Sequence, residues 1–247
     1  MSLASVNDRA DECQHLLLSN PVLSRTVLRY AESGSIGGPR RIERPVTGAA
    51  GWLRVGHPYA RWVVWVGDAP EIAVAHLARR LPRRTRHVQG VARQADRIAA
   101  VVGADGELLV AAAWLHDIGY APELADTGFH PLDGARFLRH QGVDGRLCGL
   151  VAHHSCAVIE AEMRGLAAEL LAEFPREESV VSDALTYCDL TTGPDGQRLT
   201  VDERLAEIVS RYGPDSLVGR FIDQARQEMI GAVRRTEERL RGAGVEP

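Results

Sequence analysis

The feature that most constrains this chain is an adjacent histidine and aspartate, His116 and Asp117, at the end of an apolar helical segment. Residues 106–116 are predicted to form a buried helix, which ends near Gly119 and before Pro122. An imidazole and a carboxylate in a helical core are costly to bury unless a partner satisfies them. The pair therefore predicts a polar or metal-binding centre inside a helical protein.

Helical periodicity continues from about Ala69 onward, interrupted by short turns rich in Gly, Pro and Asp. Apolar residues between Val88 and Val102 recur at helical spacing, and His87 begins this stripe, so His87 should face the core. Further helices are expected over residues 130–138, 144–155, 178–191, 201–212 and 215–241. The fold class predicted for residues 69–247 is therefore an all-α helical bundle.

Residues 1–68 differ in character and are predicted to form an N-terminal extension of mixed or irregular structure, whose role the sequence does not identify. Short helices are expected at residues 7–18 and 22–31, followed by a passage rich in Gly and Pro. Residues 52–55 and 62–66 are aromatic and β-branched, which favours a small hairpin or an extended arm.

Composition limits the classes of function. The chain has 247 residues, 45% of them hydrophobic, and a formal net charge of -4, which offers no global field to attract nucleic acid or an anionic membrane. The sequence contains no lysine, which excludes Schiff-base chemistry and a P-loop lysine. The cysteines form no CxxC pair and the N-terminus does not resemble a signal peptide, so we expect a cytoplasmic protein.

Other candidate ligands surround the His-Asp pair in a definite order. His87 precedes the pair, and His130, His153, His154 and Asp189 follow it. Borderline divalent metals accept mixed imidazole and carboxylate ligation. The pattern predicts a metal site to which several helices contribute.

This ordered set resembles the HD-domain superfamily of metal-dependent phosphohydrolases. The resemblance covers about residues 70–215 and rests on His87, on His116 and Asp117 in an HDIG-type sequence, and on Asp189. It implies that these four residues bind one divalent metal. Asp183, on the same predicted helix as Asp189, is the competing candidate for the last ligand, and the segment around Asp189 is the one that looks like the family's terminal aspartate motif.

Three further histidines are similar to those that HD-domain proteins with two metals add to the site. These are His130, His153 and His154. His130 and His153 are favoured over His154 because adjacent residues on one helix point in different directions. The resemblance implies one or two divalent ions, Mn²⁺ or Fe²⁺ being favoured, with Asp117 as the bridging ligand.

Two departures from the family pattern concern the substrate. The pair His153-His154 is not followed by a GYP-type loop, which disfavours the HD-GYP phosphodiesterases and cyclic-di-GMP hydrolysis. Tyr120 stands where many HDIG sequences have lysine, and tyrosine offers only a hydroxyl to a substrate phosphate.

Arginines immediately before His87 are candidates for phosphate contact, because a guanidinium can bind two phosphate oxygens at once. Arg83 and Arg84 are the favoured members of this run, and a solvated helix end is the alternative. Glu123 is a candidate for orienting the attacking water, with an ordinary loop role as the alternative. The stretch at residues 191–196 is a candidate for lining the site from the metal side, but its Gly-Pro-Asp-Gly sequence is typical of an ordinary turn, which is the favoured interpretation.

The function expected from the resemblance is phosphohydrolysis of a small phosphorylated metabolite, nucleotide or nucleotide-derived, by metal-activated water. One alternative is a non-catalytic nucleotide-sensing or interaction module on the same fold, and a less favoured one is a di-iron oxygenase. The expected partner is the small phosphorylated substrate, with neither nucleic acid nor a membrane, and a homodimer is left open.

Overall fold

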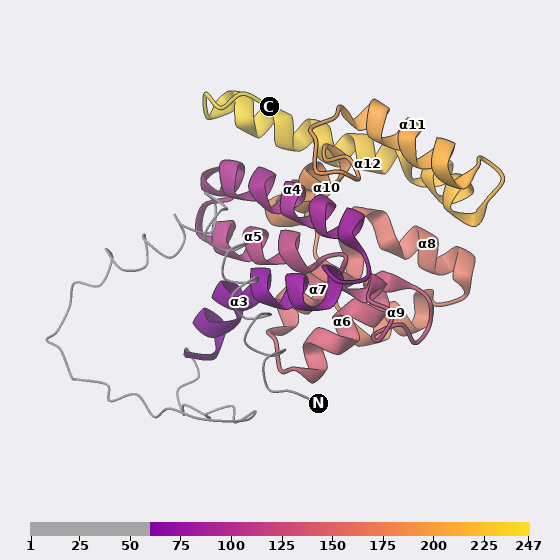
Figure 1. The fold of residues 1–247 in the computed structure, drawn as a ribbon. Helices are drawn as coiled ribbons and strands as arrows, with labels where there is room; N and C mark the ends of the chain where they lie inside the picture. The colour runs from indigo at the N-terminus through magenta and orange to yellow at the C-terminus, as the bar shows by residue number, and fades with distance from the viewer. Residues whose placement is uncertain (1–59) are drawn as a thin grey trace, which may run out of the picture. The chain divides into compact units, whose positions relative to one another are not determined.

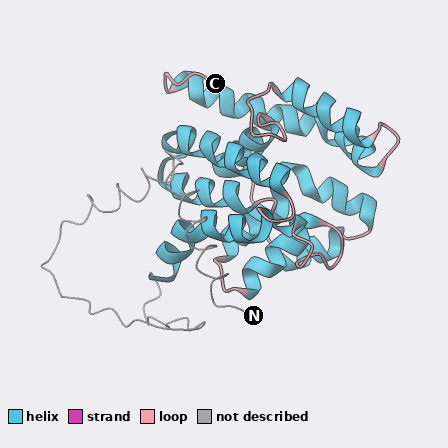
Figure 2. Cartoon of the chain, viewed as in Figure 1, coloured by secondary structure: helices cyan, strands magenta, loops and turns pink. Residues whose placement is uncertain are grey.

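The structure is a computed structural model that describes residues 60–247, with side-chain surroundings from Gly67 onward. The helices expected at residues 7–18 and 22–31, and the extended run at residues 52–55, lie outside the described residues. Within residues 60–247 the chain consists of helices and loops (Figure 2), and one isolated bridge pairs Thr192 with Arg198. The predicted all-α class is confirmed.

The helices follow one another closely along the chain (Figure 1). In order they are α3 (Ala60–Leu77), α4 (Pro82–Ile98), η1 (Ala99–Asp105), α5 (Gly106–Leu115), η2 (Ile118–Tyr120), α6 (His130–His140), α7 (Gly145–His153), η3 (His154–Cys156), α8 (Ala157–Arg164), α9 (Ala167–Glu173), α10 (Val180–Leu190), α11 (Val201–Tyr212) and α12 (Leu217–Gly242). The elements labelled η are short 3₁₀ helices, which commonly connect or end α-helices.

The helical region begins earlier than the sequence indicated. We expected a hairpin or an extended arm at residues 62–66, but these residues lie within α3. The local preference of aromatic and β-branched residues for strands is a weak one that tertiary packing overrides. Here Ala69, Ala73 and Leu77, spaced four residues apart, are fully buried on one face of α3.

The central helix of the bundle is α5, which packs against α3, α4, α7 and α10. Figure 1 shows α3, α4 and α5 side by side. Leu109, Ala112 and Leu115 of α5 have no exposed surface, because neighbours cover the helix on all sides. His116 and Asp117 directly follow α5 and consequently lie in the interior of the bundle.

The apolar stripe predicted on α4 faces the core. Val88, Val91, Ala95 and Ile98 are fully buried, and His87 at the start of the stripe is 1% exposed. A histidine that shares the buried face of an amphipathic helix must find its polar partners inside the protein. His87 is thus directed toward the end of α5.

The C-terminal helices α11 and α12 pack against each other, and α12 also packs on α8 and α10. Figure 1 shows them together along one side of the bundle. The bounds predicted for α11 match the observed ones, and Thr200 begins it through a capping box with Glu203. This layer covers α10, which carries Asp189.

A break separates α7 from α8, where we expected one helix over residues 144–155. α7 ends at His153, and Ser155 (φ 48°) and Cys156 (φ 62°) are left-handed. Left-handed backbone is unfavourable for residues with a side chain, and such strain persists only where the surrounding structure imposes it. Because of this break, the side chain of His154 points in a different direction from the one that a continuous helix would give it.

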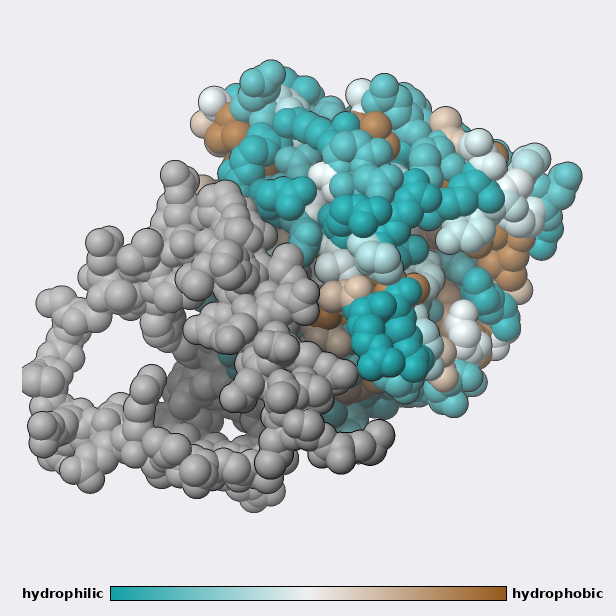
Figure 3. Space-filling model, viewed as in Figure 1, coloured by the Kyte–Doolittle hydropathy of each residue, from teal (hydrophilic) through white to brown (hydrophobic). Residues whose placement is uncertain are grey.

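Hydrophilic residues dominate the face of the described region shown in Figure 3. The segment Pro82–Tyr120 meets a length and composition criterion for a membrane span, with a mean hydropathy of 1.7. It is nevertheless divided among α4, η1, α5 and η2, and half of its tested window is buried in the bundle. Core helices meet the same criterion, so this segment is weak evidence for a membrane span.

Gly119, the last residue of the HDIG sequence, allows η2 to lie directly on α6. A Cβ atom at Gly119 would lie 2.1 Å from the carbonyl oxygen of His130 and 2.6 Å from the backbone nitrogen of Gly134. Both are backbone atoms that cannot rotate away. The lack of a side chain at Gly119 therefore allows the His-Asp pair and His130 to lie this close together.

We predict that Gly119→Ala lowers the free energy of unfolding by about 1–3 kcal/mol, because the added methyl group overpacks a backbone contact. Urea denaturation followed by circular dichroism measures the change. Gly145→Ala is the matched control, since a Cβ there meets nothing within 4 Å. Equal stability of the two variants would contradict the prediction.

Candidate metal centre

Two groups of potential metal ligands meet at the end of α5. His87, His116 and Asp117 form the first group, and Asp117, His130 and His154 form the second. Within each group the ligand atoms lie within 4.8 Å of one another. Asp117 belongs to both groups. The arrangement can therefore accommodate two neighbouring ions that share this carboxylate.

Backbone carbonyl groups set the orientation of three of these imidazoles. In each case Nδ1 lies within hydrogen-bond distance of a carbonyl oxygen, which can only accept, so Nδ1 carries the proton. The distances are 3.1 Å for His87 to Gly193, 2.8 Å for His116 to Ala113 and 2.6 Å for His154 to Val151. The neutral form of each ring then turns an unprotonated Nε2 toward the centre, as metal-binding histidines do.

The inward nitrogen atoms are poorly satisfied by the protein itself. Nε2 of His116 is buried without a hydrogen-bond partner and lies 3.3 Å from Oδ2 of Asp117. Nε2 of His130 lies 3.2 Å from Nε2 of His154 and 3.3 Å from Oδ1 of Asp117. Converging lone pairs beside carboxylates are the chemistry of a cation site, so the residues present fit a divalent metal.

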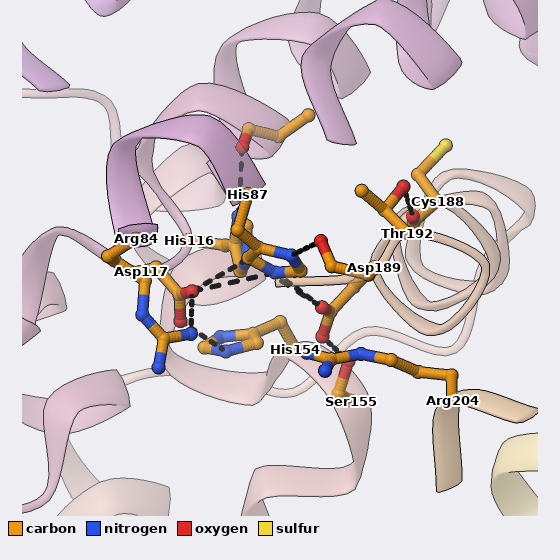
Figure 4. Close-up of polar contacts among 12 residues, drawn as sticks. Arg84, His87, His116, Asp117, His154, Ser155, Cys188, Asp189, Thr192 and Arg204 are labelled. Atoms are coloured by element: carbon orange, nitrogen blue, oxygen red, sulfur yellow. Dashed lines mark hydrogen bonds and ion pairs between the residues drawn. The ribbon is translucent and has the colours of Figure 1, made fainter. Parts of the chain in front are cut away.

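Asp189 joins the centre from α10 (Figure 4). Its Oδ1 lies 3.0 Å from Nε2 of His87, and its Oδ2 accepts a hydrogen bond from the hydroxyl of Ser155 at 2.5 Å. Asp183, the competing candidate, instead accepts hydrogen bonds from Arg235 at 2.6 and 2.8 Å. Of the two aspartates on α10, the structure brings only Asp189 to the His-Asp pair.

The electrostatics of the centre favour ionised carboxylates and a neutral imidazole. Burial acts to raise the pKa of Asp117, but Arg84 and then His116 outweigh it and hold this pKa well below its usual range. Burial also acts to raise the pKa of Asp189, but the neighbouring His87 and His116 outweigh burial and lower this pKa. Burial, followed by the nearby His116 and His130, lowers the pKa of His154 to about 3. These are the protonation states in which both residue types bind metals.

Arg84, Tyr120 and His130 form a stack beside the shared carboxylate. The Arg84 guanidinium donates a hydrogen bond of 2.5 Å to Asp117 and lies 4.0 Å from the centre of the Tyr120 ring. The Tyr120 ring in turn stacks on His130 with a centroid distance of 3.9 Å. The side chain of Arg84 is 17% exposed, so this stack connects the centre with solvent.

Three of the predicted site residues lie elsewhere. His153 binds the carbonyl oxygen of Phe174 through Nε2 at 2.8 Å and belongs to neither ligand group. Arg83 is exposed and binds Asp195. Glu123 accepts a hydrogen bond from His76 on the surface.

Sequence reasoning missed three contributors. Ser155 binds Asp189, and the only signal for it is its place directly after the two histidines. An ordinary turn was the favoured interpretation of residues 191–196, but the Gly193 carbonyl of this turn orients His87, in line with the alternative role beside the site. Arg204 is buried on α11 and lies in the close-up of the site (Figure 4). No sequence motif indicated this residue.

A family model, that of the HD domain, matches residues 84–189. This match contains the whole run from Arg84 to Asp189 that the geometry brings together. Residues 84–189 therefore form an HD domain, the domain that characterises the HD superfamily of metal-dependent phosphohydrolases. This HD domain indicates metal-dependent hydrolase chemistry, in agreement with the resemblance deduced from the sequence.

Two curated relatives are similar to part of the chain. Both are named tRNA (cytidine(56)-2'-O)-methyltransferase. The protein from Picrophilus torridus is 33% identical over 102 residues, which cover 40% of this chain and 29% of the relative. The protein from Thermoplasma volcanium is 40% identical over 76 residues, which cover 31% of this chain and 22% of the relative. The similarity thus spans less than a third of either relative, and no solved structure matches the chain.

The adjacent histidines provide a matched pair of variants. We predict that His154→Ala loses the metal held by the second ligand group, because Nε2 of His154 faces Asp117 and His130, whereas His153→Ala retains the full metal content. Elemental analysis of the purified variants measures this, with circular dichroism to check folding. A larger metal loss in His153→Ala would contradict the arrangement.

Proposed function

We propose that this protein is a metal-dependent phosphohydrolase that acts on a small phosphorylated metabolite, a nucleotide or a nucleotide-derived phosphoester or anhydride. The observation that carries the proposal is the pair of ligand groups that share Asp117. Paired metal sites of this kind are widespread among enzymes that hydrolyse phosphate esters and anhydrides.

The proposed ligands follow from the geometry. His87, His116, Asp117 and Asp189 would hold one ion, and Asp117, His130 and His154 would hold the second. Mn²⁺ and Fe²⁺ suit a ligand set that mixes imidazoles with carboxylates. His153 has no place in this set, because its Nε2 is engaged by the Phe174 carbonyl.

A bound divalent metal supplies an acidified water and draws charge from phosphoryl oxygens. The chain's own residues do the positioning. Ionised Asp117 and Asp189 compensate metal charge, and the backbone carbonyls hold the imidazoles in the required tautomer. Glu123 is not part of this proposal, since its carboxylate binds His76 on the surface.

Arg84 and Tyr120 are the proposed substrate contacts. The Arg84 guanidinium is partly exposed beside Asp117 and can donate to phosphate oxygens. Burial raises the pKa of Tyr120, so its phenol remains protonated and can donate a hydrogen bond. Together they replace the lysine that many HDIG sequences carry at the Tyr120 position.

The similarity to proteins named for a cytidine of tRNA supports a nucleotide-related substrate for the shared segment. That similarity also leaves most of each relative unmatched, so it gives no support for methyl transfer by this chain. The proposal therefore takes the reaction from the HD domain and only the nucleotide character of the substrate from the relatives.

The test combines elemental analysis of the purified protein with a phosphate-release screen over nucleotides, dinucleoside polyphosphates and sugar phosphates. We expect bound Mn or Fe and hydrolysis of at least one nucleotide substrate by the wild-type protein. Asp117→Ala should lose both metal and turnover, because Asp117 belongs to both ligand groups.

Other results of this screen would favour the alternatives. Tight nucleotide binding without hydrolysis across the panel would indicate a sensing module. Iron with an oxygen-dependent spectroscopic change, and product carrying an atom from O₂, would indicate an oxygenase. Hydrolysis that persists in metal-free Asp117→Ala would rule out the proposed mechanism.

Two neighbouring arginines test the substrate contact. Arg84→Ala is expected to raise KM about ten- to hundredfold, the effect of losing a charge-assisted hydrogen bond. Arg83→Ala should leave KM unchanged, because Arg83 lies on the surface against Asp195. Steady-state kinetics measures both, with metal content as the control, since Arg84 also contacts Asp117. Equal effects of the two substitutions would assign Arg84 no role with the substrate.

A further inference from the structure

One arginine of the described region is buried although some of its N–H donors have no hydrogen-bond acceptor. Arg204 on α11 is 4% exposed, and its Nε is buried with no hydrogen-bond partner. Nη1 donates to Glu207 at 2.5 Å, the only hydrogen bond of this side chain within the described residues 60–247. An unpaired buried donor costs about 1–3 kcal/mol, so its retention calls for a physical reason.

The place of Arg204 gives that reason. Figure 4 shows its side chain leaving α11 with the guanidinium directed toward Ser155 and Asp189. A short loop joins α10 to α11, and in this loop the backbone N–H of Leu199 donates a hydrogen bond to the carbonyl oxygen of Thr191. Arg204 therefore approaches the metal centre from the side of Asp189, whereas Arg84 approaches it from the side of Asp117.

We propose that Arg204 binds a second phosphoryl group of the substrate, so that the preferred substrates carry at least two linked phosphoryl groups. The inference rests on the proposed phosphohydrolase function and narrows its substrate class. Arg84 contacts one phosphoryl group beside Asp117, and Arg204 contacts the next one beside Ser155 and Asp189. The free Nε and Nη2 form the edge of the guanidinium that can bind two oxygens at once.

A purely structural role makes a different prediction. If Arg204 only compensates the charge of Asp189, its loss weakens metal binding and stability, and phosphate and pyrophosphate binding fall together. If it binds a second phosphoryl group, its loss affects pyrophosphate selectively. The ratio of the two affinities separates these roles.

The experiment measures binding of pyrophosphate and of orthophosphate to the full-length, manganese-loaded protein by isothermal titration calorimetry. Arg204→Met, which keeps the length of the side chain without its charge, is expected to weaken pyrophosphate binding about ten- to hundredfold and to leave orthophosphate binding unchanged. Arg226→Met on α12 is the matched control and should change neither affinity, because the ion pair of Arg226 in the part of the chain that the structure describes is with Asp202, at 3.8 Å.

Arg204→Lys keeps the buried charge and serves where Arg204→Met does not fold. It should weaken pyrophosphate binding several-fold, since lysine lacks the planar fork of donors. Unchanged pyrophosphate binding in the Arg204 variants, or equal loss of both anions, would overturn the inference. Pyrophosphate binding that depends on Arg204 in a protein without hydrolase activity would instead overturn the proposed function alone.

Discussion

The structure is organised around the buried carboxylate of Asp117. Nε2 atoms of His116 and His130 lie 3.3 Å from its two oxygens, Nε2 of His87 lies at 3.7 Å, and Arg84 donates to it at 2.5 Å. A carboxylate costs several kcal/mol to bury unless charges and donors surround it. The helices that carry these partners must therefore meet at the end of α5, and the bundle is the arrangement that lets them do so.

The backbone does much of the positioning at this centre. Carbonyl groups of Ala113 and Val151 hold imidazoles from within their own helices, and Gly193 holds His87 from a turn more than a hundred positions along the chain. The left-handed residues Ser155 and Cys156 turn the chain after α7. Local strain there is compensated by the hydrogen bond that Ser155 gives to the metal-facing aspartate.

The HD domain and the helix that follows it contribute different residues to the centre. The match at residues 84–189 contains every residue of the two ligand groups, so the chemistry of metal binding lies within it. α11, which begins at Val201, lies beyond that match and carries Arg204, whose side chain is directed toward the same centre. The candidate metal ligands thus lie within the HD domain, whereas the proposed contact with a second phosphoryl group comes from the segment that follows it.

By itself the sequence determined the helical class, the inward direction of His87, and the order of the His-Asp pair and Asp189, because helical periodicity and residue chemistry are local properties. Only the tertiary structure decided between His153 and His154, since that choice depends on a backbone break rather than on helical spacing. The same holds for Arg204 and for Gly193, whose roles arise from packing between distant segments. The sequence specifies which polar side chains need partners in the core, and the packing of distant segments specifies which partners they contact.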